Sequence, residues 1–341
     1  MSTIEEPRAA TTAIGHDYSK RLMVFGGRCS MELAAKIAGK LDLDLGRADL
    51  KTFADGEVYC RYGESIRGAD VFLVQSTAAN EASGMTPNDA LMELLLMADA
   101  AQGASAHRII AVMPWFGYAR QDKKSAPREP ISARVVAKTL EGVGVDRVLT
   151  MDLHAGQVQG FFHVPVDHMT AMPMLSQWFL DQAFTEELVV VSPDAGRVKV
   201  ARNFARKLGT HWAVMEKERP AQQVAEIGYV VGDVKGKTAI LVDDMIATAG
   251  TLTAAAETVL EEGAARVIAC ATHGVFSGPA NDRLADSAID QIVVTDTIPL
   301  RPGTPEKITV LSTAGTFADS IRRIFTDDSV SEIFAGENQL F

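Results

Sequence analysis

Short apolar runs alternate along this chain with amphipathic stretches of helical length, and this alternation restricts the fold more than any other feature. A strand covered on both faces reads as a continuous apolar run, because neither face needs polar side chains. Repeated strand–helix alternation is typical of parallel sheets wrapped by helices, so the sequence predicts an α/β protein. The expected strands are 21–25, 71–74, 108–113, 147–151, 188–191, 239–242, 266–271, 291–294 and 307–311, and the clearest helices are 88–101, 131–143, 195–208 and 252–262.

Length and charge restrict the class of protein. A chain of 341 residues favours two domains. The net charge of -11 argues against nucleic acid as a partner, and no apolar stretch reaches the length needed to span a membrane. Residues 1–19 have neither the basic nor the apolar region of a secretion signal. We therefore expect a cytoplasmic protein with a disordered N-terminal extension.

The segment 242–251, VDDMIATAGT, is the strongest indication of a ligand site. In parallel α/β sheets, ligands gather beyond the carboxyl ends of the strands. Here Asp243 and Asp244 end an apolar run, and small and hydroxylated residues open the next helix. Small residues let successive N–H groups turn toward one point, and the helix N-terminus adds to this anion site. The segment predicts a phosphate cradle beside carboxylates suited to sugar hydroxyls or magnesium; the alternative is a capping Asp and a tight turn.

A second candidate is the basic segment that follows the expected strand 108–113. It carries Arg120, Lys123, Lys124 and Arg128, with Pro130 near its end. Guanidinium and ammonium groups in a loop of this kind suit a polyphosphate, whose charge they neutralise. A solvated charged loop is the alternative interpretation.

Eleven ordered motifs identify a family. They are FADGE at 53–57, ESIRGADVFLVQST at 64–77, ELLLMADA at 93–100, GYARQDKK at 117–124, EPISAR at 129–134, MDLHAGQVQGFF at 151–162, VSPDAG at 191–196, EKERP at 216–220, VGDVKGKTAILVDDM at 231–245, ATHGVFSGPA at 271–280 and SVSEIF at 329–334. In this order they make the chain, from about residue 21 to residue 334, similar to the ribose-phosphate pyrophosphokinases.

The resemblance implies a fold and a reaction. It implies two α/β domains of phosphoribosyltransferase type with parallel-sheet cores, one formed by 20–168 with 318–341 and one by 169–317, and an active site between them. The family transfers the diphosphoryl group of MgATP to the anomeric hydroxyl of ribose 5-phosphate, giving 5-phosphoribosyl 1-diphosphate and AMP for nucleotide, histidine and tryptophan biosynthesis. It also implies magnesium as cofactor, a homohexamer, and inorganic phosphate and ADP as candidate regulators.

The resemblance further assigns roles to matching residues, with the adenine strip at 53–57 lent by a neighbouring subunit. The implied residues are Phe53, Asp55, Gly56, Glu57, Arg120 and Gln121 for ATP; His154 and Asp194 for magnesium; Lys217 and Arg219, on a flexible loop, for catalysis; and Arg219, Asp243, Asp244, Ala247, Thr248, Ala249, Gly250 and Thr251 for ribose 5-phosphate.

Each polar candidate also has an ordinary structural interpretation. Lys217 and Arg219 flank Glu218, so an extended segment would place both cations on one side, yet such a run is also common on surfaces. His154 would serve magnesium only as one ligand among phosphates and water, since magnesium prefers oxygen. Asp194 precedes an expected helix and can cap it while also meeting a metal.

Three positions depart from the family pattern. Position 247 is Ala where most relatives carry Asp, position 197 is Arg where Gly is common, and Glu332 stands where an aromatic is usual, beside the family's regulatory site. Two rival hypotheses stay open: a phosphoribosyltransferase, which would share the 242–251 loop, and a non-catalytic, regulatory relative of the synthetase, which Ala247 and Glu332 favour.

Overall fold

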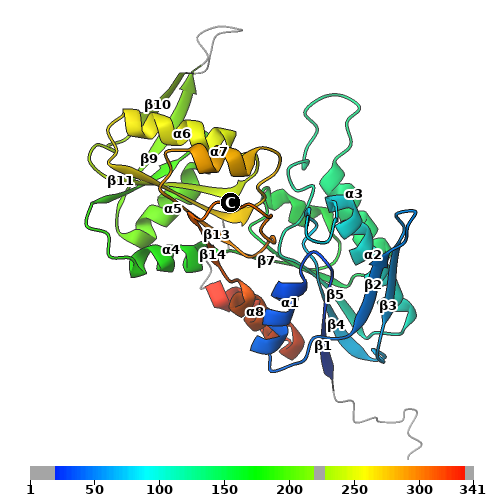
Figure 1. Ribbon diagram of the computed structural model, residues 1–341. Coiled ribbons are helices and arrows are strands. Elements are labelled where there is room, and N and C mark those ends of the chain that lie inside the picture. The colour runs from blue at the N-terminus through cyan, green and yellow to red at the C-terminus, as the bar shows by residue number, and fades with distance from the viewer. Residues whose placement is uncertain (1–19, 219–226, 335–341) are drawn as a thin grey trace, which may run out of the picture.

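The first half of the chain forms a parallel sheet. The structure, a computed structural model, describes residues 20–218 and 227–334 (Figure 1). The first sheet has the strand order β1-β4-β5-β6-β7, and every neighbouring pair is parallel. Its elements are β1 (Arg21–Gly26), α1 (Met31–Lys40), β4 (Ala69–Val74), α2 (Pro87–Gly103), β5 (Arg108–Met113), α3 (Ser132–Gly142), β6 (Arg147–Met151), a 3₁₀ turn (Gly156–Phe161) and β7 (Val166–Met169).

The second half forms a larger sheet with the order β10-β9-β8-β11-β12-β13-β14. All neighbouring pairs are parallel except β9 and β10, which form an antiparallel hairpin at the edge. Its elements are α4 (Met172–Asp181), β8 (Leu188–Ser192), a 3₁₀ turn (Ala195–Arg197), α5 (Val198–Leu208), β9 (His211–Glu218), β10 (Ile227–Val231), β11 (Thr238–Ile246), α6 (Gly250–Glu261), β12 (Arg266–Gly274), α7 (Ala280–Asp286), β13 (Gln291–Thr295) and β14 (Ile308–Leu311).

One apolar cluster joins the two sheets. Phe72 of β4 and Leu149 of β6 belong to the same buried cluster as Ile240 of β11 and Val293 of β13, and Phe317 of the last helix is fully buried in it. Burying such side chains is the main favourable contribution to folding. The two sheets are therefore stabilised by a shared core as well as by their own.

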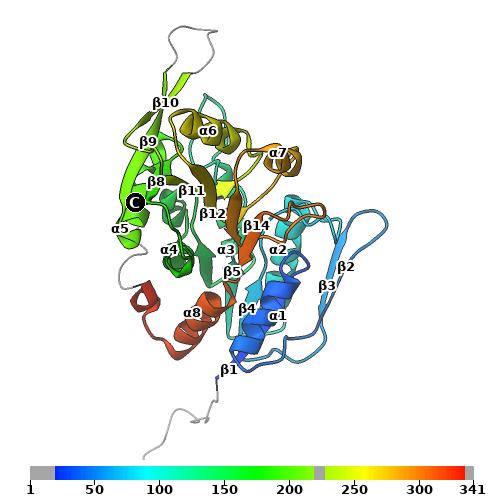
Figure 2. The same ribbon diagram turned by 60° about the vertical axis from the view of Figure 1, so that its left-hand side comes forward.

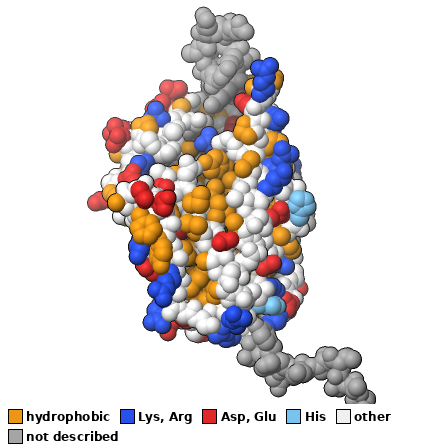
Figure 3. Space-filling view, turned by 90° about the vertical axis from the view of Figure 1, so that its right-hand side faces the viewer, with side chains coloured by type: hydrophobic (Ala, Val, Ile, Leu, Met, Phe, Trp, Pro, Cys, Tyr) orange, Lys and Arg blue, Asp and Glu red, His pale blue; other side chains and the backbone are white. Residues whose placement is uncertain are grey.

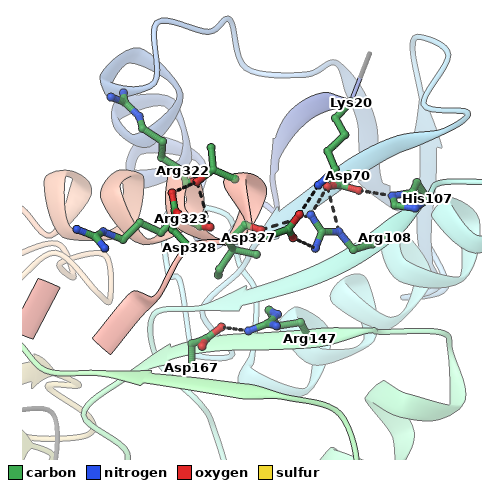
Figure 4. Close-up of polar contacts among 12 residues, drawn as sticks. Lys20, Asp70, His107, Arg108, Arg147, Asp167, Arg322, Arg323, Asp327 and Asp328 are labelled. Atoms are coloured by element: carbon green, nitrogen blue, oxygen red, sulfur yellow. Dashed lines mark hydrogen bonds and ion pairs between the residues drawn. The ribbon is translucent and has the colours of Figure 1, made fainter. Parts of the chain in front are cut away.

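The chain ends by returning to the first sheet. Helix α8 (Ala314–Thr326) lies beside α1, as Figures 1 and 2 both show. At its C-terminal end, Asp327 accepts hydrogen bonds from Lys20 and from Arg108 Nη1, the latter at 3.0 Å (Figure 4). Arg108 also pairs with Asp70 of β4, so this ion-pair cluster ties the end of α8 to β4 and β5. None of the described helices is long and apolar enough to cross a membrane.

The observed elements confirm the α/β prediction. All nine expected strands and all four expected helices are present, with ends that differ by a few residues at most. The sequence analysis did not assign the hairpin of β2 (Ala48–Thr52) and β3 (Val58–Tyr62), nor β7, β9 and β10. Strands β2, β3 and β7 are short and partly exposed and lack a continuous apolar run. Residues 1–19, expected to be disordered, lie outside the described part.

Candidate active site

The predicted phosphate cradle is a turn between β11 and α6. Strand β11 is buried along most of its length and runs to Ile246 between β8 and β12. Ala249 then takes a left-handed conformation with φ of 63° and caps α6, which begins at Gly250. The first N–H groups of a helix have no partner within that helix. The turn thus presents free donors at a helix N-terminus, as an anion site requires.

A cation lies behind this turn. Arg283 of α7 donates from Nη1 to the carbonyl oxygen of Thr248 at 3.0 Å. A Cβ atom at Gly250 would lie 3.1 Å from the same nitrogen, so glycine gives the guanidinium its room there. Arg283 both fixes the loop and adds positive charge near the expected phosphate. The sequence analysis missed this residue, since its only signal is proximity across 35 positions of the chain.

One cleft gathers most of the predicted site. Residues from the ends of β6, β8 and β11 and from the basic loop after β5 line a cavity of about 210 Å³. The residues predicted for the site that line it are Arg120, His154, Asp194, Asp243, Asp244, Ala247, Thr248, Ala249, Gly250 and Thr251. Four segments far apart in the sequence therefore meet at the carboxyl edges of two sheets.

The two carboxylates differ in their surroundings. Asp243 is 27% exposed, whereas Asp244 is 8% exposed and has both oxygens engaged. Arg197 Nη2 lies 2.7 Å from Asp244 Oδ1, and His154 Nδ1 lies 2.8 Å from Asp244 Oδ2. Burial and the neighbouring Asp244 charge raise the pKa of Asp243 well above its ordinary value. Burial would also raise the pKa of Asp244, but His154 and Arg197 outweigh it and keep that pKa below its ordinary value.

Arg197, which the family pattern left unexplained, is the counter-ion of this carboxylate pair. Its Nε lies 3.4 Å from Asp243 Oδ1, and its Nη2 also donates to the backbone oxygen of His154 at 3.3 Å. Its own backbone N–H donates to Asp194 Oδ1 at 3.0 Å, which makes Asp194 the N-cap of the following turn. The capping interpretation of Asp194 is confirmed.

The donor set suits a metal carried by a nucleotide. Among residues 20–218 and 227–334, no group of three or more His, Cys, Asp or Glu side chains is arranged to hold an ion. His154 and the exposed Asp194 line the same cleft but supply only two donors. Magnesium is usually held by one or two protein ligands together with substrate phosphates and water. The residues therefore fit magnesium bound to ATP and do not form a closed metal centre.

The basic loop is held in place by its own side chains. Glu129 accepts hydrogen bonds from the backbone N–H groups of Ser125 at 2.7 Å and Ala126 at 2.9 Å. Gln121 accepts one from the hydroxyl of Ser132 at 2.6 Å and, like Arg120, is exposed. Arg120 thus stands at the cleft with its guanidinium accessible to a ligand.

The adenine strip lies elsewhere. Phe53, Asp55, Gly56 and Glu57 form the tip of the β2–β3 hairpin, and none of them lines the cleft. The Phe53 ring is 46% exposed and packs edge-on against Tyr59 at 5.7 Å. Figure 1 shows the hairpin on the outer side of the first sheet, away from the loop between β11 and α6.

The catalytic pair is only partly described. Lys217 was expected on a flexible loop, but its backbone belongs to β9, where it pairs with Gly228 of β10. Antiparallel pairing explains the difference, because it extends the strand past the last apolar residue. Arg219 lies outside the described residues.

A larger cavity of about 750 Å³ lies on another side of the molecule. It is lined by Arg147, Asp167 and residues 327–331 that follow α8, several of which appear in Figure 4. The unusual Glu332 is next in sequence, and its carboxylate pairs with Arg323 at 2.8 Å. This is the region that the resemblance associates with regulation.

Comparison with known proteins gives consistent results. A family model described as the N-terminal domain of ribose phosphate pyrophosphokinase matches residues 22–144, and one described as a phosphoribosyl synthetase-associated domain matches residues 213–335. Curated ribose-phosphate pyrophosphokinases from Caldanaerobacter subterraneus and Chromobacterium violaceum are each 50% identical, over 93% of this chain and 99% and 95% of theirs. The solved phosphoribosylpyrophosphate synthetase of Mycobacterium smegmatis is 45% identical, covers 90% of this chain and all of its own, and superimposes with a TM-score of 0.84.

Proposed function

We propose a reaction for this chain, which belongs to the ribose-phosphate pyrophosphokinase family, a family of diphosphotransferases. In this reaction the anomeric hydroxyl oxygen of ribose 5-phosphate attacks the β-phosphorus of ATP. The bond from that phosphorus to the oxygen it shares with the α-phosphate breaks, AMP leaves with that oxygen, and the hydroxyl proton is released. The product is 5-phosphoribosyl 1-diphosphate, a precursor for nucleotide, histidine and tryptophan biosynthesis.

The observation that carries the proposal is the composition of the single cleft at the end of β11. The turn at Ala247–Thr251 supplies amide donors for the 5-phosphate, Asp243 faces the ribose hydroxyls, and the exposed Arg120 lines the same cleft. Transfer of a phosphoryl group needs little covalent help from the protein, so positioning and charge stabilisation account for most of the catalysis.

The remaining roles complete this proposal. Gln121 joins Arg120 on ATP, Lys217 and Arg219 bring cations to the transferring phosphates, and His154 and Asp194 hold magnesium. When bound, magnesium would neutralise part of the charge on the ATP phosphates. The protein's own contribution is to orient the two substrates and exclude water.

The exposed hairpin tip supports a shared site. Phe53, Asp55, Gly56 and Glu57 form a polar strip with one open aromatic ring, yet none of the four lines the cleft that Arg120 lines. We therefore assign the strip to the ATP site of a neighbouring subunit in a homohexamer. Figure 3 shows that apolar side chains gather on the face that lies at the right of Figure 1, the side on which α2 and α3 are labelled. Met92 of α2 and Val135 of α3 are each about half exposed. Apolar patches of this kind mark protein contacts.

Membership of this family also suggests how the chain divides into domains and where it is regulated. We propose that 20–168 with 318–341 form the ATP-side domain and that 169–317 form the ribose-5-phosphate domain, since α8 packs on α1. Inorganic phosphate and ADP would act at the cavity lined by Arg147 and Ser329. Glu332 follows the lining residue Ser331 in sequence, and its carboxylate pairs with Arg323 at 2.8 Å.

The test is release of AMP from ATP and ribose 5-phosphate, measured by a coupled assay with and without the sugar phosphate. We expect AMP only when both substrates are present. Release of diphosphate from 5-phosphoribosyl 1-diphosphate plus a purine base, without AMP formation from ATP, would identify a phosphoribosyltransferase instead. A folded protein inactive in both assays would be the non-catalytic relative.

A further inference from the structure

His154 is held by a buried carboxylate and a partly buried cation, and this arrangement decides where its ring proton lies. Its Nδ1 is 2.8 Å from Asp244 Oδ2 and 3.0 Å from Arg197 Nη2. Arg197 Nη2 is 2.7 Å from the other oxygen of Asp244. One donor, Arg197 Nη2, and one acceptor, Asp244 Oδ2, therefore lie within hydrogen-bonding distance of the same imidazole nitrogen.

The chemistry of these groups leaves one consistent assignment. A guanidinium can only donate, and an ionised carboxylate can only accept. At 2.8 Å, Asp244 Oδ2 and a deprotonated Nδ1 would face each other as two acceptors, so Nδ1 must carry the proton. The Arg197 guanidinium then donates to Asp244 Oδ1 and to the His154 carbonyl oxygen instead.

In the neutral ring, the other nitrogen, Nε2, then keeps its lone pair. Among the hydrogen bonds between described residues, none involves Nε2 of His154, and the side chain is 36% exposed in the cleft. A metal-binding histidine typically donates its second N–H to a carboxylate, which fixes the ring and makes it more basic. The Asp244–His154 contact has this form.

We propose that Asp244 and Arg197 are positioning residues, which hold His154 with its proton on Nδ1 and its Nε2 free for the metal of MgATP. The inference rests on the proposed function and divides the neighbouring carboxylates between two tasks. Asp243, with a 27% exposed side chain, serves the ribose, whereas Asp244, predicted from the resemblance to bind ribose 5-phosphate, serves the metal side through His154.

The tautomer can be measured in the protein without substrates. ¹⁵N chemical shifts of the His154 ring distinguish a proton on Nδ1 from one on Nε2, and a His154→Gln variant assigns the signals. We expect the Nδ1–H form in the wild-type protein. An Nε2–H ring would overturn the proposal, and this result needs no variant of Asp244 and no enzymatic activity.

The variant Asp244→Asn gives an opposite and specific expectation. Arg197 can only donate, so it takes the amide oxygen of Asn and turns the amide NH₂ toward His154. Nδ1 must then accept, and the ring proton moves to Nε2. Loss of such an outer contact typically weakens metal affinity 10–100-fold. We expect a loss of this size in MnATP binding, measured by electron paramagnetic resonance of Mn²⁺, with ribose 5-phosphate binding changed less than about threefold.

Two further variants separate this role from a merely structural one. Asp243→Asn should weaken ribose 5-phosphate binding in calorimetry and leave the tautomer and MnATP binding unchanged. Adding Arg197→Met to Asp244→Asn lets the amide turn its oxygen toward His154, so the Nδ1–H form should return. Equal effects of both Asn variants on both ligands, or no recovery in the double variant, would overturn the proposal. Because these readouts are binding and spectroscopy, an inactive enzyme would refute the proposed function without affecting them.

Discussion

Asp70 gives the sharpest prediction of stability, because its carboxylate is 1% exposed and fully engaged. It lies on β4 and accepts hydrogen bonds from Arg108 Nε at 3.0 Å, Arg108 Nη2 at 2.5 Å and His107 Nδ1 at 2.7 Å. Asp70→Asn removes the charge while keeping the shape. One partner of a buried ion pair is then left without its counter-ion.

The size of the loss in stability depends on the contacts that Arg108 retains in the variant. Removing one partner of a buried pair costs about 3–5 kcal/mol. Arg108 is partly exposed and still meets Asp327 at 3.0 Å, so the lower end of that range applies. We expect Asp70→Asn to lower the free energy of unfolding by about 3 kcal/mol at pH 7.

The pH dependence supplies a second, independent expectation. Burial would raise the pKa of Asp70, but the hydrogen bonds from Arg108 and His107 outweigh burial and lower it below its ordinary value. A group with a lowered pKa in the folded state stabilises above its unfolded pKa, about 3.9 for Asp, and loses this contribution as the pH falls through the folded pKa. The difference between wild type and variant should therefore be full at pH 7 and 5 and shrink below about pH 4.

The assay is guanidinium denaturation of both proteins at one protein concentration, followed at pH 7, 5 and 3.5. Asp49→Asn is the matched control, since Asp49 is 58% exposed and meets Lys51 at 3.4 Å. Exposed pairs of this kind contribute about 0–1 kcal/mol. A loss below 1 kcal/mol for Asp70→Asn at pH 7, or a difference that grows as the pH falls, would refute the reasoning.

Three further predictions concern the proposed reaction. Lys217→Ala should lower kcat by about a hundredfold or more with little change in the KM for ATP, because the cation acts on charge developed in the transition state; steady-state kinetics beside the exposed-lysine control Lys235→Ala check this, and a near-normal kcat would make Lys217 a surface charge. Mixing an Asp55 variant with an Arg120 variant should restore part of the activity in hybrid oligomers, since some sites would hold two intact halves; subunit exchange without recovery would exclude a shared site. Ala247→Asp should change the KM for ribose 5-phosphate less than about tenfold, because the donors are backbone amides, whereas Thr251→Ala should cost about 1.5–3 kcal/mol; the reverse order in kinetics, or activity gained only on Ala247→Asp, would contradict this.

Local sequence patterns predicted the fold well. Continuous apolar runs in β4, β5 and β11 report burial on both faces, and this needs no information from other parts of the chain. The hairpin of β2 and β3 was not predicted, because its residues are partly exposed and its stability depends on packing against α2. Elements whose burial comes from distant neighbours have no local signal.

In the candidate site, too, features set by adjacent residues could be predicted, and features set by distant residues could not. The cradle at 242–251 could be predicted because a strand, small residues and a helix start are adjacent in sequence. The different tasks of Asp243 and Asp244 could not, because they depend on His154 and Arg197, which come from other strand ends. Arg283 likewise reaches Thr248 only through the packing of α7 on α6.

The apolar cluster that joins the two sheets also limits how the enzyme can open. Rotating one half away from the other would divide the apolar cluster that holds Phe72, Ile240 and Phe317, and would bring some of its side chains into water. Each fully exposed side chain of that size costs about 1.5–3 kcal/mol, so even a few would make a hinge motion rare. The cleft must therefore admit and release its ligands with the two halves in place. Entry and release of ligands then depend on the loops at the rim of the cleft. Substitutions in these loops should therefore change the turnover rate more than substitutions at the junction of the sheets.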